Sequence, residues 1–496
     1  MRFTSLIVEL IRARPRLVVW VVVLVMAAIW LAVPLLFYGS PPGDVATVLA
    51  VGREYQVGTA AGPPLAFWLA DLAFRAAGNG IFGVYLLAQI CFAVTMLALY
   101  RLGRAIVGGP HAALAVLLTV TITAFGPPGV AFGPDVLARP LWALTLLHGW
   151  QVIGQGRRNA WFALSIEGGL LLLTTPSAGW LLGLLAGFAL ATPRGRQRLA
   201  SLDPLYAVVV VIALALPYLI WLIRTDSLAD SSWPTLEHLD LRAIQAAQTL
   251  GWLLLTLAAV AVLAVMNSRR VARDDRSART IQRAPVDPLG RQFVYVFAIA
   301  PAIVGALLAG LSGRGGGDGG VALLLSGLAV VVASGDVIAL RDQKLLRKIW
   351  AFTVAAPALA VAAIAVLQPW IGGAEPPTAL PASAMAKFFG ESFERRTGRP
   401  LPAVAGDPRI AALVALAPSR PRLLLDATPW LTPARFAETG GVVVWRASDT
   451  IGAPPPDIAQ RFPGLVPEIP RAFDRLVNGR NPPVRIGWAI VRPRTP

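Results

Sequence analysis

Charged residues and cysteine are both scarce in this sequence, and each scarcity excludes a class of protein. Only 14% of the 496 residues are charged and 56% are hydrophobic, a composition far more apolar than that of a soluble globular protein. Cys91 is the only cysteine and lies inside an apolar run, which excludes a disulfide framework. His111, His148 and His238 are far apart and lack the spacing of metal ligands. The composition therefore predicts a polytopic membrane protein.

The net charge of +17 would suggest a nucleic-acid partner in a protein of ordinary composition. Here the arginines lie mostly in short segments between apolar runs, where they act as signals of membrane topology. We therefore predict no nucleic-acid binding. Abundant arginine and alanine with little lysine is typical of GC-rich bacterial genomes, so we place the chain in a bacterial inner (cytoplasmic) membrane.

Hydrophobic runs predict about eleven membrane spans, since ~20 apolar residues suffice to cross a bilayer. The first run, 17–37, follows a basic start and has no A-x-A cleavage site after it, so we expect an uncleaved span with a cytoplasmic N-terminus. Residues 63–77 are predicted to form an amphipathic segment at the outer surface. The other spans are expected near 81–100, 111–126, 136–153, 160–174, 177–192, 203–223, 249–267, 293–311, 320–340 and 349–370.

Basic residues collect in alternate loops between these runs, including a cluster at 269–283, whereas the remaining loops contain few. This pattern follows the positive-inside rule. An odd number of spans then places residues 371–496 on the outer side of the membrane.

The C-terminal part differs in pattern from the rest. Short apolar strands near 401–405, 422–426, 441–446 and 485–492 alternate with helical patterns near 383–396, 408–417 and 433–439. Such alternation predicts a small α/β domain. We therefore expect a transmembrane domain at 1–370, with a first periplasmic loop at 38–80, and a periplasmic α/β domain at 371–496.

Two segments carry the most informative motifs. The polar interval 39–68 contains Asp44, its first acid, and later the sequence Pro63-Pro64-Leu65 followed by Trp68. The segment 132–142, FGPDVLARPLW, places Asp135 at the outer end of a predicted span, on the same side as Asp44.

These segments resemble the GT-C membrane glycosyltransferases of the protein O-mannosyltransferase and lipid A aminoarabinose transferase type. In that family the first outer loop carries an acid pair near its start and an acid-(Lys/His)-Pro-Pro-Leu-x-x-x-Trp segment near its end, and a Pro-Asp-x-x-Leu segment ends the fourth span. The resemblance implies a GT-C-like helical membrane fold and a sugar donor on a polyprenyl phosphate. No cofactor is required in this reading, and a divalent cation is left open.

The resemblance also implies roles for residues on the outer side. A carboxylate that takes the proton of an acceptor hydroxyl accelerates transfer by ~10² to 10⁴, and Asp44 is the expected base. Arginine suits the leaving lipid phosphate because its planar fork binds phosphate oxygens in pairs. The expected substrate-binding residues are Asp135, Arg139, Arg53, Arg75 and Arg224. Arg139 follows Asp135 by one helical turn, and either an ion pair with Asp135 or a contact with a lipid phosphate fits that spacing.

The sequence also departs from the family pattern. Val45 stands where the second acid is usual, Ala61 and Gly62 precede the Pro-Pro-Leu motif, and the first lysine of the chain is Lys344. Three functions therefore stay open. The first is a polyprenyl-phosphate-sugar-dependent glycosyltransferase that modifies a lipid, such as lipopolysaccharide, or a cell-envelope glycan. The second is a catalytically inactive relative that binds a lipid-linked sugar or acts as a scaffold, and the third is a transporter or flippase, for which the chain shows no paired repeat.

Overall fold

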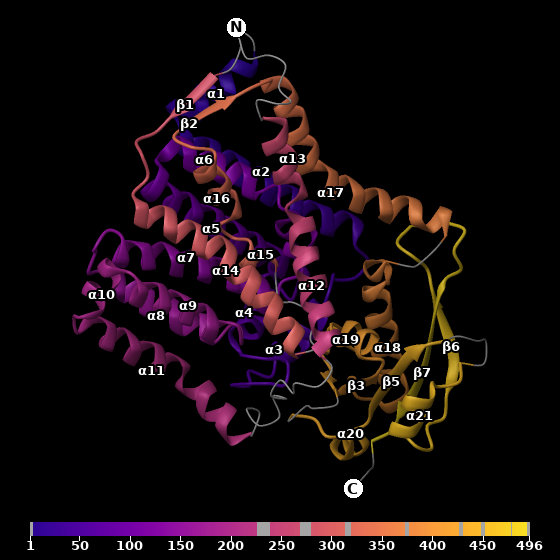
Figure 1. Cartoon of the computed structure of the whole chain (residues 1–496). Helices are drawn as coiled ribbons and strands as arrows, with labels where there is room; N and C mark the ends of the chain where they lie inside the picture. Colours follow the sequence, from indigo (N-terminus) through magenta and orange to yellow (C-terminus); the bar gives the residue numbers. More distant parts are fainter. Residues whose placement is uncertain are drawn as a thin grey trace. The chain divides into compact units, whose positions relative to one another are not determined.

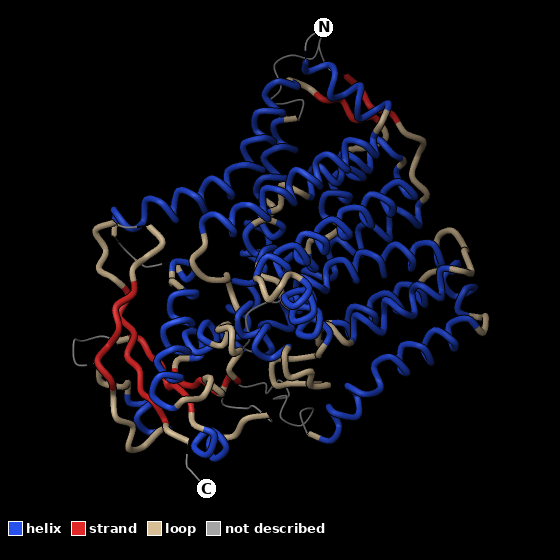
Figure 2. Tube along the Cα trace, turned by 180° about the vertical axis from the view of Figure 1, so that it is seen from behind, coloured by secondary structure: helices blue, strands red, loops and turns tan. Residues whose placement is uncertain are grey.

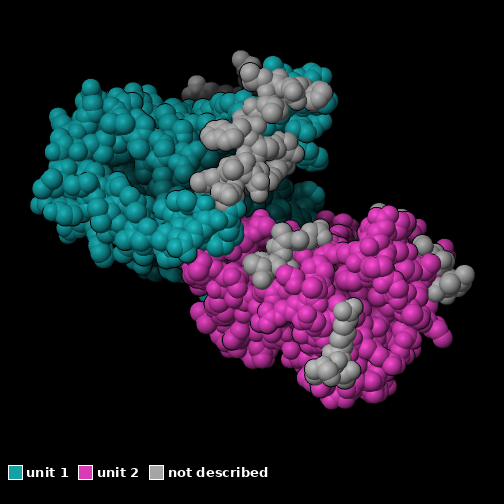
Figure 3. Space-filling view, turned by 90° about the horizontal axis from the view of Figure 1, so that it is seen from below, with its two compact units in different colours: residues 1–31, 86–359 teal, residues 32–85, 360–496 magenta. Residues whose placement is uncertain are grey.

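The computed structural model describes residues 3–225, 239–267, 279–312, 319–372, 376–425, 430–447, 452–477 and 479–493. His238 and most of the predicted basic loop at 269–283 lie outside these residues. The chain forms two compact units, of which unit 1 comprises Met1–Leu31 and Leu86–Leu359 and unit 2 comprises Ala32–Tyr85 and Ala360–Pro496 (Figure 3). Each unit therefore combines segments that are distant in the sequence.

Unit 1 is built mainly of apolar helices (Figure 1). They are α1 (Phe3–Ala13), α2 (Pro15–Phe37), α5 (Ile81–Val107), α6 (Gly109–Thr119), α7 (Pro134–Ile153), α8 (Ala160–Leu172), α9 (Ala178–Ala191), α10 (Pro193–Leu199), α11 (Asp203–Arg224), α12 (Leu239–Thr256), α13 (Ala258–Met266), α14 (Pro288–Ser312), α15 (Gly319–Ala322), α16 (Ser326–Ala333) and α17 (Gln343–Ile371). The C-terminal parts of α2 and α17 and the first residues of α5 lie in unit 2.

Among the described residues, five helices are long and apolar enough to cross a membrane, or up to seven if each of two bent helix pairs is one span. Three shorter apolar helices accompany them. The polytopic helical architecture is therefore confirmed, and the chain is a multi-pass membrane protein. The number of about eleven spans stays a prediction.

Two predicted spans are interrupted in the structure. The run at 111–126 bends by 80° between α6, which ends at Thr119, and the short 3₁₀ turns at 123–130. The run at 320–340 leaves the helical conformation after Ala333, and Gly335 adopts a φ of 89°. Its last residues form strand β2 (Val337–Leu340), which pairs antiparallel with β1 (Arg279–Gln282).

Aromatic side chains fill the centre of unit 1. Phe293 and Phe297 lie four residues apart on α14, so that they share one helix face, and their ring centroids are 4.7 Å apart. Phe188 of α9 contacts both rings, and Trp142 and Trp150 of α7 each contact one of them. These contacts join three helices through one buried cluster.

Unit 2 contains a five-stranded sheet in the order β4-β3-β5-β7-β6 (Figure 2). The strands are β3 (Ala403–Gly406), β4 (Arg422–Leu423), β5 (Gly441–Arg446), β6 (Glu468–Phe473) and β7 (Val484–Val491), and the helices are α3 (Val45–Gly52), α4 (Leu65–Ala76), α18 (Ala382–Thr397), α19 (Pro408–Val414), α20 (Pro433–Thr439) and α21 (Pro456–Arg461), with a 3₁₀ turn η3 (Pro377–Ala379). Strands β4, β3 and β5 are parallel, whereas β5, β7 and β6 are antiparallel. The small C-terminal α/β fold is confirmed.

The polar interval after α2 packs against this α/β fold. The amides of Gly39 and Ser40 donate to the Thr378 carbonyl at 2.8 and 3.1 Å. Ala46 and Ala50 of α3 belong to the hydrophobic core that α18, α19 and the sheet share. The segment that begins with Asp44 is therefore held by residues more than 300 positions later in the chain.

Close packing of α3 against α4 gives a direct test of this arrangement. A Cβ atom on Gly52 would lie 2.2 Å from the Phe67 carbonyl oxygen, so Gly52→Ala is expected to destabilise the protein by about 1 to 3 kcal/mol. Thermal unfolding of the detergent-purified protein measures the change. Gly251→Ala is the matched control, since a Cβ there meets nothing within 4 Å and alanine favours the helix. Equal unfolding temperatures for the two variants would contradict the packing described here.

Candidate functional site

Asp44 precedes the first turn of α3. Its backbone has φ −97° and ψ 16°, and its side chain caps no amide of the helix. The residue is exposed, and within the described part of the chain its carboxylate makes no hydrogen bond or ion pair. The carboxylate is therefore accessible and is not committed to a structural role.

Nine residues further on, the same interval enters a cluster of charged side chains centred on Asp71 of α4. Asp71 is fully buried, yet its carboxylate has three partners. Tyr55 donates its hydroxyl at 2.9 Å, Arg75 Nε lies 2.6 Å from Oδ2, and Arg420 donates to Oδ1. Two arginines, one of them from the α/β fold, therefore compensate one buried carboxylate.

Glu54 forms the second half of the cluster. Its side chain is 7% exposed, and Oε1 lies 3.3 Å from Arg422 Nε and 3.7 Å from Arg53 Nε. Burial lowers the pKa of Arg53, against the opposing effect of Glu54, and the nearby Arg420 and Arg422 lower it further. Arg53 Nη1 is buried, and it has no hydrogen-bond partner among the residues that the structure describes. Arg53 is thus a cation whose surroundings favour an additional negative charge.

The cluster as a whole has more positive than negative charge. Its four arginines face two carboxylates. They are Arg53, Arg75, Arg420 and Arg422, opposite Glu54 and Asp71. The side chains of Arg75 and Arg422 are 50% and 43% exposed, so this charge is accessible from outside. An arginine-rich group of this kind suits a phosphate or another anion.

Backbone strain accompanies the cluster. Tyr55 and Arg420 adopt φ values of 46° and 48°, which residues with a Cβ rarely do. Burial, and secondly the hydrogen bond to Asp71, raise the pKa of Tyr55, so its hydroxyl stays a donor. The Arg75 guanidinium also lies 5.5 Å from the centre of the Tyr55 ring. Such strain persists where surrounding contacts fix the chain, and it is frequent at functional sites.

The remaining sequence-predicted residues lie in unit 1. Asp135 is exposed in the first turn of α7, and Arg139, one turn later, is buried with its guanidinium 5.5 Å from the centre of the Phe125 ring. Arg224 is exposed in the last turn of α11. The structure thus brings Arg53 and Arg75 into one cluster, places Asp135 and Arg139 on one helix, and puts Arg224 on another.

Sequence reasoning missed Glu54, Asp71, Arg420 and Arg422. The spacing of Asp71 and Arg75, four residues apart on a predicted helix, was an available signal. The adjacent charges of Arg53 and Glu54 were a second available signal. No local pattern distinguishes Arg420 or Arg422 from other surface arginines.

A second, partly buried ionisable pair was also missed. His148 Nδ1 of α7 lies 2.7 and 2.9 Å from the two oxygens of Glu167 on α8. His148 also lines a cavity of about 410 Å³ with Gln151, Arg157 and Arg158. Among the described residues no group of three or more His, Cys, Asp or Glu side chains could hold a metal ion.

Comparisons with known proteins agree with this architecture. The family model described as dolichyl-phosphate-mannose-protein mannosyltransferase matches residues 61–221. The crystal structure of ArnT from Cupriavidus metallidurans bound to undecaprenyl phosphate aligns over 96% of this chain and 99% of ArnT, with a TM-score of 0.59 and 14% sequence identity. The chain therefore has the GT-C fold seen in ArnT, and its residues 61–221 are similar to a mannosyltransferase family. No match was found among curated proteins.

The range that matches the family model divides the candidate residues of this chain. Asp71, Arg75, Asp135 and Arg139 lie inside residues 61–221. Asp44, Arg53 and Arg224 lie outside that range, as do Arg420 and Arg422 of the α/β fold. At 14% identity the likeness to ArnT shows the fold, and the roles of individual residues are argued from the contacts described above.

Proposed function

We propose that the protein is a glycosyltransferase that moves a sugar from a polyprenyl-phosphate donor to a lipid or cell-envelope glycan acceptor at the outer face of a bacterial inner membrane. The GT-C fold and the match to a mannosyltransferase family support sugar transfer. The undecaprenyl phosphate bound to ArnT supports a polyprenyl-phosphate donor. The observation that carries the proposal is an accessible carboxylate, Asp44, directly before a short helix that leads to an arginine-rich cluster.

The chemistry assigns a role to each part. Asp44 takes the proton of the acceptor hydroxyl as that oxygen attacks the anomeric carbon. The bond from the anomeric carbon to the phosphate oxygen breaks, and the lipid phosphate leaves with the bonding electrons. Arg53 and Arg75 are placed to stabilise an anion, because the cluster has two more positive charges than negative ones.

A specific observation favours a second candidate, an inactive relative that binds a lipid-linked sugar. Val45 is buried at the start of α3, where the family usually has its second acid. The segment before the Pro-Pro-Leu motif is a tight turn in which Thr59 and Gly62 exchange backbone hydrogen bonds at 2.9 and 3.3 Å. An inactive relative of this kind would still bind an anion at the arginine-rich cluster but would not transfer the sugar.

Mass spectrometry of membrane glycolipids and lipopolysaccharide tests the proposal. We expect a strain that lacks this protein to lose one defined sugar mass, and the wild-type gene to restore it. Arg101→Gln, a change on the side expected to be cytoplasmic, is the control that should also restore it. Identical glycolipid profiles with and without the protein, in a strain that makes its donor, would refute the transferase and favour the binding protein.

A further inference from the structure

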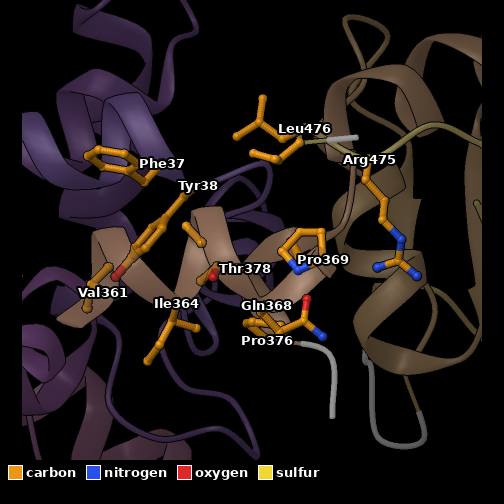
Figure 4. A pocket seen from close by; sticks show the side chains of 13 residues that line it. Phe37, Tyr38, Val361, Ile364, Gln368, Pro369, Pro376, Thr378, Arg475 and Leu476 are labelled. Carbon is orange, nitrogen blue, oxygen red and sulfur yellow. The ribbon is translucent and has the colours of Figure 1, made fainter. Parts of the chain in front are cut away.

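Unit 2 contains a cavity of about 190 Å³ that the proposed transfer does not use (Figure 4). Its walls come from four places in the sequence, one of which is the turn η3 with Thr378 and Ala379. Tyr38 follows the end of α2, Ile364 and Gln368 lie in the last part of α17, and Leu476 belongs to the loop between β6 and β7. The cavity therefore lies where two membrane-spanning helices end and the α/β fold begins.

Most of the lining is apolar. Phe37, Val361, Ala365 and Pro369 contribute hydrocarbon surface, in addition to the side chains named above. Such a surface binds hydrocarbon, with a few polar groups that set orientation. On α17, Ile364 is 52% exposed, so one wall is continuous with the helix surface that faces lipid.

The position of the cavity relative to the membrane follows from the chain itself. Tyr38 and Trp370 stand at the ends of α2 and α17, where aromatic residues mark the interface between lipid and water. The β6–β7 loop is fixed at this level, because the amides of Arg480 and Asn481 donate to the Pro369 carbonyl at 2.8 and 3.2 Å. A Cβ on Gly479 would lie 2.5 Å from that carbonyl oxygen, so glycine permits the close approach.

Charge indicates the kind of lipid. The hairpin from Glu468 to Val491 contains four arginines and two acids, a net charge of +2. Arg475 lines the cavity on the side of the α/β fold (Figure 4). Arg471 and Arg480 are exposed on the same hairpin. Basic residues next to a bilayer attract anionic headgroups by roughly 1 kcal/mol each.

We propose that this cavity binds an acyl chain of an anionic phospholipid whose headgroup lies at the arginines of the β6–β7 hairpin. The lipid would contact both the end of α17 and the start of the polar interval, because residues of both line the cavity. Gly39, next to Tyr38, donates its amide to the carbonyl of Thr378 in the cavity wall. Binding at this cavity does not depend on the proposed transfer reaction.

Photolabelling tests the site. The full-length protein is reconstituted in vesicles that contain phosphatidylglycerol with a diazirine in one acyl chain, irradiated, digested and mapped by mass spectrometry. We expect label on the segment 475–477, which lies in a loop of the α/β fold rather than in a spanning helix. Ala365→Trp, which fills the cavity, should reduce that label about tenfold.

Leu367→Trp is the matched control, because Leu367 lies on the same helix, is 51% exposed and does not line the cavity. It should leave the label on 475–477 unchanged. If Ala365→Trp fails to fold, Ala379→Leu fills the cavity from the turn η3 instead. Absence of label from 475–477 in the wild type, or equal labelling in the filled and control variants, would overturn the site.

A second comparison tests the headgroup. Phosphatidylglycerol should label 475–477 about fivefold more than a phosphatidylcholine probe with the same acyl chain, and Arg475→Gln should remove most of that preference. Equal labelling by both probes in the wild type would overturn the assignment of an anionic lipid.

Discussion

Replacing Asp71 by asparagine is expected to destabilise unit 2 by about 3 kcal/mol, since removing one partner of a buried ion pair leaves its neighbours uncompensated. Asp71 is 0% exposed and has contacts to Tyr55, Arg75 and Arg420. Asparagine keeps the size of the side chain and removes the charge. Arg420, whose side chain is 18% exposed, would then keep its positive charge without this carboxylate.

Two measurements detect this effect in the purified protein. Thermal unfolding should shift to lower temperature, and limited proteolysis should cut the interval 38–80 faster, because Arg420 is one of the contacts that hold it to the α/β fold. Asp474→Asn removes an exposed acid from the same unit and should change neither measurement.

A double variant separates the ion pair from other effects. Arg420→Gln added to Asp71→Asn should cost less stability than Arg420→Gln alone, because the partner is already gone. Additive losses would show that the two residues act independently, and equal unfolding of Asp71→Asn and Asp474→Asn would show that the buried carboxylate is not needed.

The sequence predicted the elements better than their interruptions. Six of the seven secondary-structure elements expected in the C-terminal part lie within a few residues of observed ones, and the seventh, at 422–426, is partly described as β4. Strand β6 escaped prediction because Pro470 interrupts it and only Phe473 of its residues is buried, so it lacks the alternation of a half-buried strand. The end of the helix before Gly335 was missed because hydropathy alone does not register a left-handed residue.

The candidate site shows where local patterns stop being informative. Arg53 and Arg75 were chosen because arginine binds phosphate, and the structure places both in one cluster. Arg75 shares Asp71 with Arg420, a residue 349 positions away from that aspartate, and Arg53 shares Glu54 with Arg422. Such a contact depends on how unit 2 folds around the sheet. The local pattern of a single sequence does not indicate which residues so far apart will meet.

The second large effect concerns Asp44. In the proposed reaction Asp44→Asn should lower the rate of sugar transfer by about 10² to 10⁴, because the amide cannot accept the proton of the acceptor hydroxyl. Since Asp44 makes no side-chain cap to α3, the substitution removes no helix-capping bond, and expression and stability should stay near wild type. A fall in activity would then report on chemistry rather than folding.

Transfer from a synthetic polyprenyl-phosphate sugar, measured with purified protein, gives the decisive comparison. A base acts in the transition state, so kcat should fall while KM for the donor changes little. If the cluster binds the donor phosphate, Arg53→Gln should instead raise KM for the donor and change kcat less. An Asp44→Asn protein with full activity would remove Asp44 as the base, and among the accessible acids identified from the sequence it would leave Asp135, at the start of α7, as the next candidate.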